Sequence, residues 1–177
     1  MRNKALLLDR DGVINLDHGH VHRIVNFEFV DGIFELLKYA QQKDYLLIII
    51  TNQAGIGRGL YSEETFANLN SWMCDKFLSE EIVINHVYYC PSHPHLGVGV
   101  YKKNDFRRKP SPGMILDAEM DFDLDLKMCV LVGDNKTDME AGVAAGVGCN
   151  LLLNRKDELN HDTYKVVSRL ADVKRYL

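Results

Sequence analysis

The chain has 177 residues, of which 46% are hydrophobic, and its 21 Lys and Arg against 25 Asp and Glu give a net charge of −4. This length corresponds to about one domain, and the apolar content is sufficient for a core, so extensive disorder is excluded. The small negative charge gives no general attraction for nucleic acid or an anionic membrane, and no apolar run is long enough to span a bilayer. We therefore expect a cytoplasmic protein, a monomer or weak oligomer, with neither nucleic acid nor membrane as a partner.

Short apolar runs alternate with helical periodicities along the chain. The runs cover residues 5–8, 46–50, 87–89, 129–132 and 149–153, and such uninterrupted runs are typical of parallel strands covered on both faces. Amphipathic helices are predicted around residues 33–40 and 66–77, after Ser111, from Thr137 to Gly146, and around Tyr164, Val167 and Leu170. The alternation predicts a doubly wound, Rossmann-like α/β sheet of about five parallel strands flanked by helices, in a single domain over residues 1–177. Two long loops, about 15–29 and 90–109, interrupt it.

Polar motifs directly follow three of the apolar runs. They are Asp9-Arg10-Asp11-Gly12, Thr51-Asn52-Gln53 and Gly133-Asp134-Asn135. Each motif alone is typical of an ordinary turn. Because the carboxyl ends of parallel strands share one edge, where open α/β sheets bind ligands, we expect the three motifs to meet there.

The residue types at this edge point to phosphoryl chemistry. Carboxylates of Asp9, Asp11 and Asp134 would repel one another, and oxygen ligands of this kind suit Mg²⁺ together with a substrate phosphate. Phosphate oxygens could be held by Thr51, Asn52 and a cation from Arg108 or Lys109. With no Ser or Cys beside a base, the candidate nucleophile is Asp9 at the strand end, and Asp11 is the candidate general acid and base.

Four motifs in this order resemble the haloacid dehalogenase superfamily, and within it the branch of heptose-bisphosphate and histidinol-phosphate phosphatases. They are Asp9-Arg10-Asp11-Gly12-Val13-Ile14-Asn15, Ile50-Thr51-Asn52-Gln53 with the glycines that follow, Arg108-Lys109-Pro110-Ser111-Pro112-Gly113-Met114, and Gly133-Asp134 with Asp138-Met139. The resemblance extends over nearly the whole chain and implies a phosphatase with no large cap domain.

The resemblance also implies roles for individual residues. It makes Asp9 the nucleophile, Asp11 the acid and base, and Thr51 and Lys109 the holders of the phosphate. It implies Mg²⁺ on Asp9, on the backbone carbonyl of Asp11 and on Asp134, with Asp138 orienting Lys109 or a metal-bound water from behind. Pocket positions in relatives correspond here to Asp17, His20, Gln53, Arg108 and Asn135.

The sequence departs from this branch in the loop before Arg108. Relatives usually hold a structural zinc there with a Cys-x-His pair and a Cys-x-Cys pair. Here Cys90 is followed by His93 and His95, and the second pair of cysteines is missing. A closed structural zinc site needs four ligands, so we predict that zinc is absent. Tyr101 and Phe106 are then expected to pin the loop to the domain.

The resemblance implies removal of the C7 phosphate from D-glycero-D-manno-heptose 1,7-bisphosphate, in the synthesis of surface-glycan precursors such as lipopolysaccharide. Histidinol-phosphate phosphatase and polynucleotide 3′-phosphatase are the alternative enzymes, although the net charge and the lack of an aromatic and basic groove argue against the latter. A receiver module that keeps the phosphoryl group on its aspartate is the alternative outside enzymes. Asp11 separates it from a phosphatase, since a poised acid and base promotes turnover.

Overall fold

A computed structural model describes residues 2–154 and 162–177 of the chain. In these residues six parallel strands form one sheet in the order β3-β2-β1-β4-β5-β6. The strands are β1 (Lys4–Leu8), β2 (Tyr45–Asn52), β3 (His86–Cys90), β4 (Val130–Gly133), β5 (Cys149–Leu153) and β6 (Lys165–Val167). The predicted doubly wound α/β fold is confirmed. Its strand order reverses between β1 and β4, where folds of this kind open a crevice for ligands.

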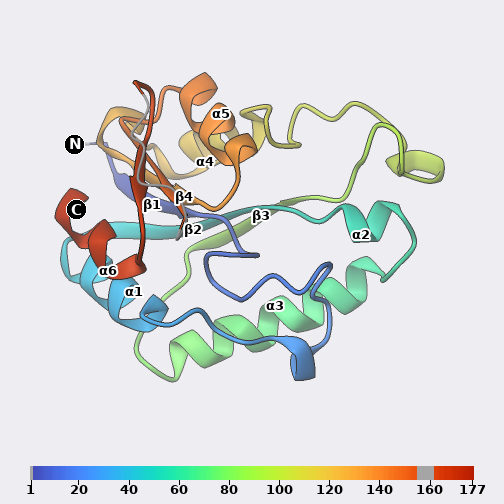
Figure 1. Ribbon diagram of the computed structural model, residues 1–177, viewed down its shortest axis with the longest axis horizontal. Coiled ribbons are helices and arrows are strands. Elements are labelled where there is room, and N and C mark those ends of the chain that lie inside the picture. Colours follow the sequence, from blue (N-terminus) through green and yellow to red (C-terminus); the bar gives the residue numbers. More distant parts are fainter. Residues whose placement is uncertain (1, 155–161) are drawn as a thin grey trace.

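Helices cover both faces of the sheet (Figure 1). They are α1 (Ile33–Gln42), α2 (Ala54–Gly57), α3 (Glu63–Leu78), α4 (Gly113–Phe122), α5 (Lys136–Ala145) and α6 (Leu170–Val173). Figure 1 shows α4 and α5 on one face and α1, α3 and α6 on the other. Alternate residues of β1 point to the two sides, since Leu6 and Leu8 join the apolar cluster beneath α1 and α3 while Ala5 and Leu7 join the cluster beneath α4. Two buried cores therefore hold the carboxyl ends of the central strands rigid.

The carboxyl-terminal elements differ from the prediction. The expected helix around Tyr164, Val167 and Leu170 is wrong over residues 165–167, which form the sixth strand, and the helix itself is only Leu170–Val173. Leu151, Leu152 and Leu153 of β5 pair with β6, and Val167 is buried in the core beneath α1. The sheet edge offers this short segment backbone hydrogen bonds that outweigh its weak helical periodicity.

Both predicted loops are long connections with only a single helical turn each, at Ile24–Asn26 and at Gly99–Tyr101. The 90–109 loop is tied together by polar contacts: Ser92 Oγ donates to Asp105 Oδ2 at 2.9 Å, and the Arg108 guanidinium donates to the Ser92 carbonyl at 3.1 Å. Tyr101 packs on a small aromatic cluster as expected. Phe106 does not, because its side chain is 63% exposed. In the described ranges no separate cap covers the carboxyl edge, and no helix is long and apolar enough to cross a membrane.

Candidate active site

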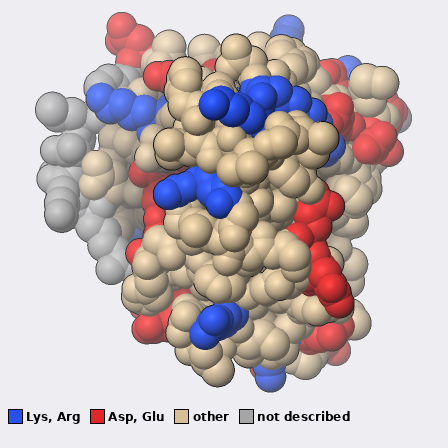
Figure 2. All heavy atoms as spheres, turned by 90° about the vertical axis from the view of Figure 1, so that its right-hand side faces the viewer, with Lys and Arg blue, Asp and Glu red and all other residues tan. Residues whose placement is uncertain are grey.

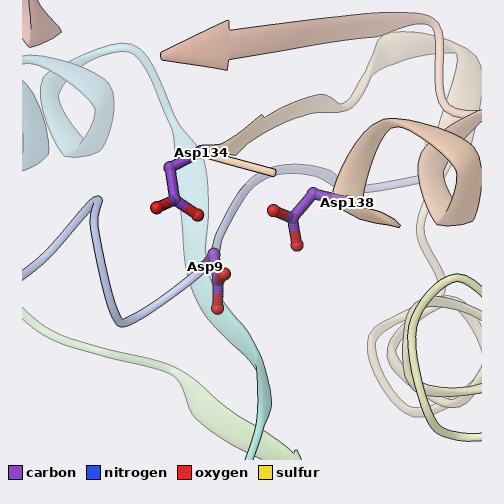
Figure 3. A group of neighbouring side chains, drawn as sticks. All are labelled: Asp9, Asp134 and Asp138. Carbon is purple, nitrogen blue, oxygen red and sulfur yellow. The ribbon is translucent and has the colours of Figure 1, made fainter. Parts of the chain in front are cut away.

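Three carboxylates meet where the strand order reverses. Asp9 directly follows β1, and its amide donates to the Val132 carbonyl of β4 at 2.9 Å. Asp134 follows β4, and Asp138 lies in the first turn of α5. One carboxylate oxygen from each lies within 4.8 Å of the others (Figure 3). The strand ends thus bring together acids that are 125 residues apart in sequence, between Asp9 and Asp134.

Glycine at position 12 makes room for this cluster. Gly12 has a φ of +87°, and a Cβ there would lie 2.0 Å from Asp134 Oδ2. A side chain would therefore both strain the turn and displace the Asp134 carboxylate. The need for glycine in the Asp9-Arg10-Asp11-Gly12 motif is thus steric as well as conformational.

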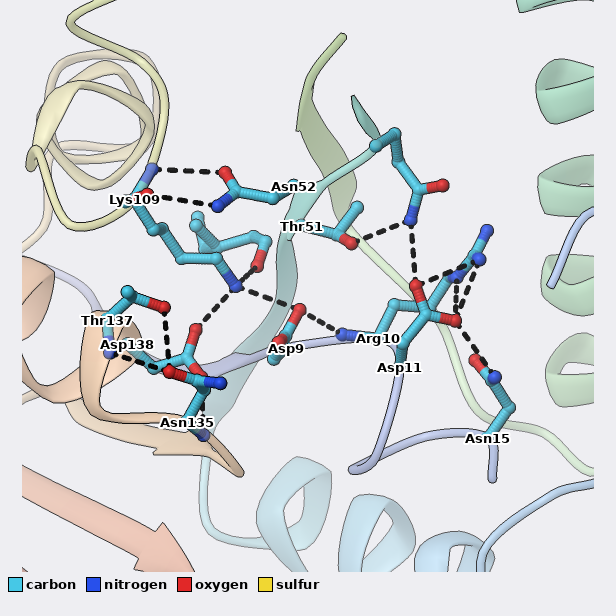
Figure 4. Close-up of polar contacts among 12 residues, drawn as sticks. Asp9, Arg10, Asp11, Asn15, Thr51, Asn52, Lys109, Asn135, Thr137 and Asp138 are labelled. Atoms are coloured by element: carbon cyan, nitrogen blue, oxygen red, sulfur yellow. Dashed lines mark hydrogen bonds and ion pairs between the residues drawn. The ribbon is translucent and has the colours of Figure 1, made fainter. Parts of the chain in front are cut away.

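Lys109 is the cation at the centre of the site. Its ammonium group lies 2.9 Å from Asp9 Oδ1, forms an ion pair with Asp138 and donates to the Ile50 carbonyl at 2.9 Å (Figure 4). Only 3% of the side chain is exposed. Burial alone would lower the pKa of Lys109, but the two neighbouring carboxylates raise it above its ordinary value. The group therefore stays charged and holds Asp9 from one side.

The acidic cluster retains excess negative charge despite Lys109. Burial, and then the charge of Asp138, raise the pKa of Asp9 to about 8 against the opposing effect of Lys109. Desolvation by the surrounding protein and the same Asp138 charge raise the pKa of Asp134 to about 6. Within the described residues Asp134 has no ion pair. Oxygen ligands with a surplus of negative charge fit a hard divalent cation such as Mg²⁺, with Asp9 and Asp134 as the available carboxylates.

Asp11 is held on the other side of Asp9. Its carboxylate accepts hydrogen bonds from the Arg10 guanidinium at 2.9 Å, from Asn15 Nδ2 at 3.0 Å and from Gln53 Nε2 at 3.0 Å (Figure 4). Arg10 is fully buried and also donates to the Val21 carbonyl at 2.7 Å. The Asp11 side chain is therefore oriented by three donors and is separated from the cluster of Asp9, Asp134 and Asp138.

In the Thr51-Asn52-Gln53 motif, Asn52 lines the cleft, whereas Thr51 and Gln53 lie beneath its wall. Asn52 pairs with the backbone of Lys109 through two hydrogen bonds of 3.0 Å, so it fixes the lysine's position. Thr51 and Gln53 are buried, at 1% and 2% exposure, and Gln53 Nε2 donates to Thr51 Oγ1 at 2.9 Å. The amide of Gln53, which we expected to contact substrate, is enclosed behind the wall.

A cleft of about 490 Å³ opens over these groups. Nine of the residues expected in the site line it, namely Asp9, Asp11, Asp17, His20, Asn52, Arg108, Lys109, Asp134 and Asn135. Asp138, Thr51 and Gln53 lie behind the lining. Asn135 also caps α5, because its side-chain oxygen accepts from the backbone N–H of Thr137 at 3.2 Å. The backbone N–H of Asn135 donates in turn to Asp138 Oδ2 at 3.0 Å. This capping box orients the Asp138 carboxylate that binds Lys109.

Sequence reasoning missed several residues of the site. Arg10 and Asn15 belong to the first motif but received no role, and Thr137 lines the cleft. Arg58 Nη1 contacts His20 Nε2 at 2.9 Å and so reaches the cleft rim. No local sequence pattern predicts that an arginine is fully buried. The position of Arg10 between Asp9 and Asp11 could nevertheless have suggested that its guanidinium pairs with a neighbouring carboxylate.

Known proteins resemble this chain over most of its length. A family profile described as HAD-hydrolase-like matches residues 106–173. A protein of Burkholderia mallei named D-glycero-alpha-D-manno-heptose-1,7-bisphosphate 7-phosphatase is 55% identical over 89% of this chain and 83% of its own length. The chain belongs to the haloacid dehalogenase superfamily. The resemblance expected from the four motifs, including its branch of heptose-bisphosphate and histidinol-phosphate phosphatases, is confirmed, and the protein is a phosphatase.

Two further relatives belong to the same branch of the superfamily. A Vibrio cholerae protein named D-glycero-beta-D-manno-heptose-1,7-bisphosphate 7-phosphatase is 41% identical over 100% of this chain and 97% of its own length. The crystal structure of D,D-heptose 1,7-bisphosphate phosphatase from B. bronchiseptica, complexed with magnesium and phosphate, is 27% identical with a TM-score of 0.84 and covers 97% of this chain and 96% of that one. Magnesium is thus the metal that the comparison supports for a phosphatase of this fold.

Proposed function

We propose that this protein is a Mg²⁺-dependent phosphatase that removes the C7 phosphate of D-glycero-D-manno-heptose 1,7-bisphosphate through an aspartyl-phosphate on Asp9. One observation carries the proposal for the chemistry: Asp9 stands at the strand-order reversal with a buried Lys109 ammonium 2.9 Å from its carboxylate. A carboxylate at this position, open to a cleft and flanked by a fixed cation, is suited to attack phosphorus. The names of the relatives support the substrate.

The roles of the residues follow from their contacts. A carboxylate oxygen of Asp9 attacks phosphorus and the bond to the sugar oxygen breaks. Lys109 stabilises the charge on the phosphoryl oxygens, while Asn52 and Asp138 hold Lys109 in place. The resemblance assigns Thr51 to the phosphate as well, and its hydroxyl, which accepts from Gln53, still has its own proton to donate. Asp11 protonates the departing sugar alkoxide and then takes a proton from the water that hydrolyses the aspartyl-phosphate.

Asp9, Asp134 and the backbone carbonyl of Asp11 would hold Mg²⁺. The bound ion supplies positive charge that offsets the repulsion between the carboxylates and the approaching phosphate. Lys109 alone does not provide this, because it lies against Asp9 and Asp138 and leaves Asp134 unpaired within the described residues.

Substrate recognition falls to the residues around the cleft. Asp17 and Asn135 offer acceptors and a donor for sugar hydroxyls, and Arg108 and the Arg58–His20 pair bring donors and positive charge for the second phosphate. His20 has a φ of +53°, a strained conformation that a functional position would explain. We propose the α anomer as the preferred substrate, since the more similar relative is named for it.

The surface supports a small anionic substrate rather than a polymer. Figure 2 shows the end of the molecule where α2 lies, and its Lys and Arg side chains form separate groups rather than one continuous band. Nucleic-acid binding uses a continuous basic track with aromatic side chains for stacking. We propose that the protein acts as a monomer or weak oligomer in the cytoplasm, without nucleic acid and without a structural zinc.

A panel assay of phosphate release tests the function. The α and β heptose bisphosphates, histidinol phosphate and a 3′-phosphorylated oligonucleotide are compared at equal enzyme and Mg²⁺ concentrations. The heptose bisphosphates should be hydrolysed fastest, with kcat/KM at least about tenfold above the others. Faster hydrolysis of histidinol phosphate or of the oligonucleotide would assign the protein to that alternative.

A further inference from the structure

Behind the cleft wall, a buried hydrogen-bond chain joins Tyr61 to Asp11. The Tyr61 hydroxyl donates to Gln53 Oε1 at 2.6 Å, and Gln53 Nε2 donates to Asp11 Oδ2 at 3.0 Å and to Thr51 Oγ1 at 2.9 Å. Tyr61 and Gln53 are 8% and 2% exposed. Both hydrogens of the Gln53 amide nitrogen and its amide oxygen therefore have protein partners.

This arrangement fixes which way the Gln53 amide faces. An ionised carboxylate only accepts hydrogen bonds, so the amide nitrogen must face Asp11, and a donor is then needed at the amide oxygen. Tyr61 is that donor. Burial raises the pKa of Tyr61 to about 12, so the hydroxyl keeps its proton at physiological pH. When Asp11 gives up or gains a proton, Tyr61 continues to hold the amide in the same orientation.

The Tyr61 ring is itself held in place. It packs so closely on Gly55 that a Cβ there would lie 2.1 Å from the ring, and it belongs to a buried cluster with Ile56 and Phe66. His22 of the 15–29 loop stacks on it with centroids 4.8 Å apart and planes 7° from parallel. The position of the hydroxyl is therefore set by rigid packing and by the loop at the cleft rim.

We infer that Tyr61 is a positioning residue for the acid and base step, acting through Gln53 on Asp11. The inference rests on the proposed function, which gives Asp11 that step. Loss of the Tyr61 hydroxyl leaves Gln53 Oε1 buried without its donor, so the amide loosens and Asp11 loses one of its three donors. Protonation of the leaving group then becomes slower, whereas attack by Asp9 is unaffected.

The test compares leaving groups in Tyr61→Phe. The ratio kcat/KM is used because it covers the steps up to departure of the leaving group and excludes hydrolysis of the aspartyl-phosphate. With D-glycero-D-manno-heptose 1,7-bisphosphate, whose alkoxide must be protonated, kcat/KM should fall roughly tenfold. With p-nitrophenyl phosphate, whose leaving group needs no proton, kcat/KM should change less than about twofold. The matched control is Tyr101→Phe, which removes a hydroxyl from the same aromatic cluster but one that faces Glu63 on the surface. It should leave both rates unchanged.

A double-mutant cycle locates the effect. Gln53→Met removes the link, so adding Tyr61→Phe to it should not change the ratio of the two kcat/KM values further. Equal losses on both substrates in Tyr61→Phe, or a further change of the ratio in the double variant, would overturn the inference. Failure of the proposed function looks different, because the wild-type protein would then not hydrolyse the heptose bisphosphate at all.

Discussion

Asp9 is the proposed nucleophile, and its carboxylate lies close to two other carboxylates, which is electrostatically unfavourable. Its side chain is 13% exposed and shares its surroundings with Asp134 and Asp138, so its negative charge is stabilised chiefly by Lys109. Replacement by asparagine keeps the size of the side chain and removes the attacking charge. Lys109 keeps its ion pair with Asp138 and its bond to the Ile50 carbonyl, so the fold should survive.

We therefore expect Asp9→Asn to lower kcat by at least about 10³-fold, as for loss of a covalent nucleophile. Steady-state phosphate release measures the effect, and circular dichroism checks that the protein is folded. Activity within tenfold of wild type would exclude Asp9 as the nucleophile.

The same residue makes stability depend on pH when Mg²⁺ is absent. The pKa of Asp9 is raised from 3.8 to about 8, so between these values the folded state holds a proton that the unfolded state releases. The free energy of unfolding should consequently fall as pH rises through this window. Thermal melts in a chelator should show a lower Tm at about pH 8 than at about pH 6, and Mg²⁺ should raise Tm more at the higher pH.

Asp9→Asn is the control for this effect. The variant has no carboxylate at position 9, so in chelator its decline in Tm across the same pH range should be smaller than that of wild type. An identical decline in the variant would assign the pH dependence to other groups.

Asp11 is predicted to matter most for poor leaving groups in the step that forms the aspartyl-phosphate, and to assist hydrolysis of that intermediate for every substrate. Asp11→Asn keeps the side chain's size but cannot transfer a proton, so kcat/KM for the sugar phosphate should fall by about 10²-fold or more. The kcat/KM for p-nitrophenyl phosphate should fall much less. Comparison of kcat/KM on the two substrates is the measurement, because kcat/KM excludes hydrolysis of the aspartyl-phosphate, and equal losses would make Asp11 a structural residue.

At the scale of elements, the 90–109 loop is stable through its own polar contacts. Asp105 accepts from Ser92 Oγ at 2.9 Å and from the Arg107 amide at 3.0 Å, and it lies 3.5 Å from Lys103. These donors hold the pKa of Asp105 below its ordinary value although its burial opposes this. The carboxylate organises the loop at the place where relatives are expected to use zinc.

Asp105→Ala should therefore destabilise the protein by about 1–3 kcal/mol, because Ser92 loses its buried partner. Asp117→Ala is the matched control, since it removes a carboxylate whose ion pair with Arg107 lies on the surface, and it should cost less than about 1 kcal/mol. Chemical denaturation measures both. Purified wild-type protein should carry well under one zinc per chain, and stoichiometric zinc that resists dialysis would contradict this account of the loop.

Sequence patterns predicted those parts of the site that lie at the carboxyl ends of parallel strands. Asp9, Thr51 and Asp134 follow apolar runs, so their approximate meeting point could be inferred from the order of the runs alone. The three-residue strand β6 could not be predicted, since the apolar run of Val166 and Val167 is too short to distinguish a strand from a helix. Nor could the enclosure of Gln53, because it depends on how the Tyr61 ring packs against Gly55, and no local pattern encodes that contact.

At the scale of the whole molecule, the fold leaves the reaction centre open. Among the described residues the cleft is bordered by loops, strand ends and the first turns of α2 and α5, and we propose that the second phosphate of the substrate lies at Arg108 and the Arg58–His20 pair at its rim. Selectivity between the two phosphates then depends on which one reaches Asp9. The proposed function requires the C7 phosphate at Asp9 and the C1 phosphate at the rim.

The regiochemistry of hydrolysis tests this claim most directly. Phosphorus NMR of D-glycero-D-manno-heptose 1,7-bisphosphate during turnover with Mg²⁺ distinguishes the two phosphate groups. We predict that the C7 signal disappears as inorganic phosphate forms, while the C1 signal remains. Loss of the C1 phosphate first, or no release from this substrate under conditions where p-nitrophenyl phosphate is hydrolysed, would contradict the account.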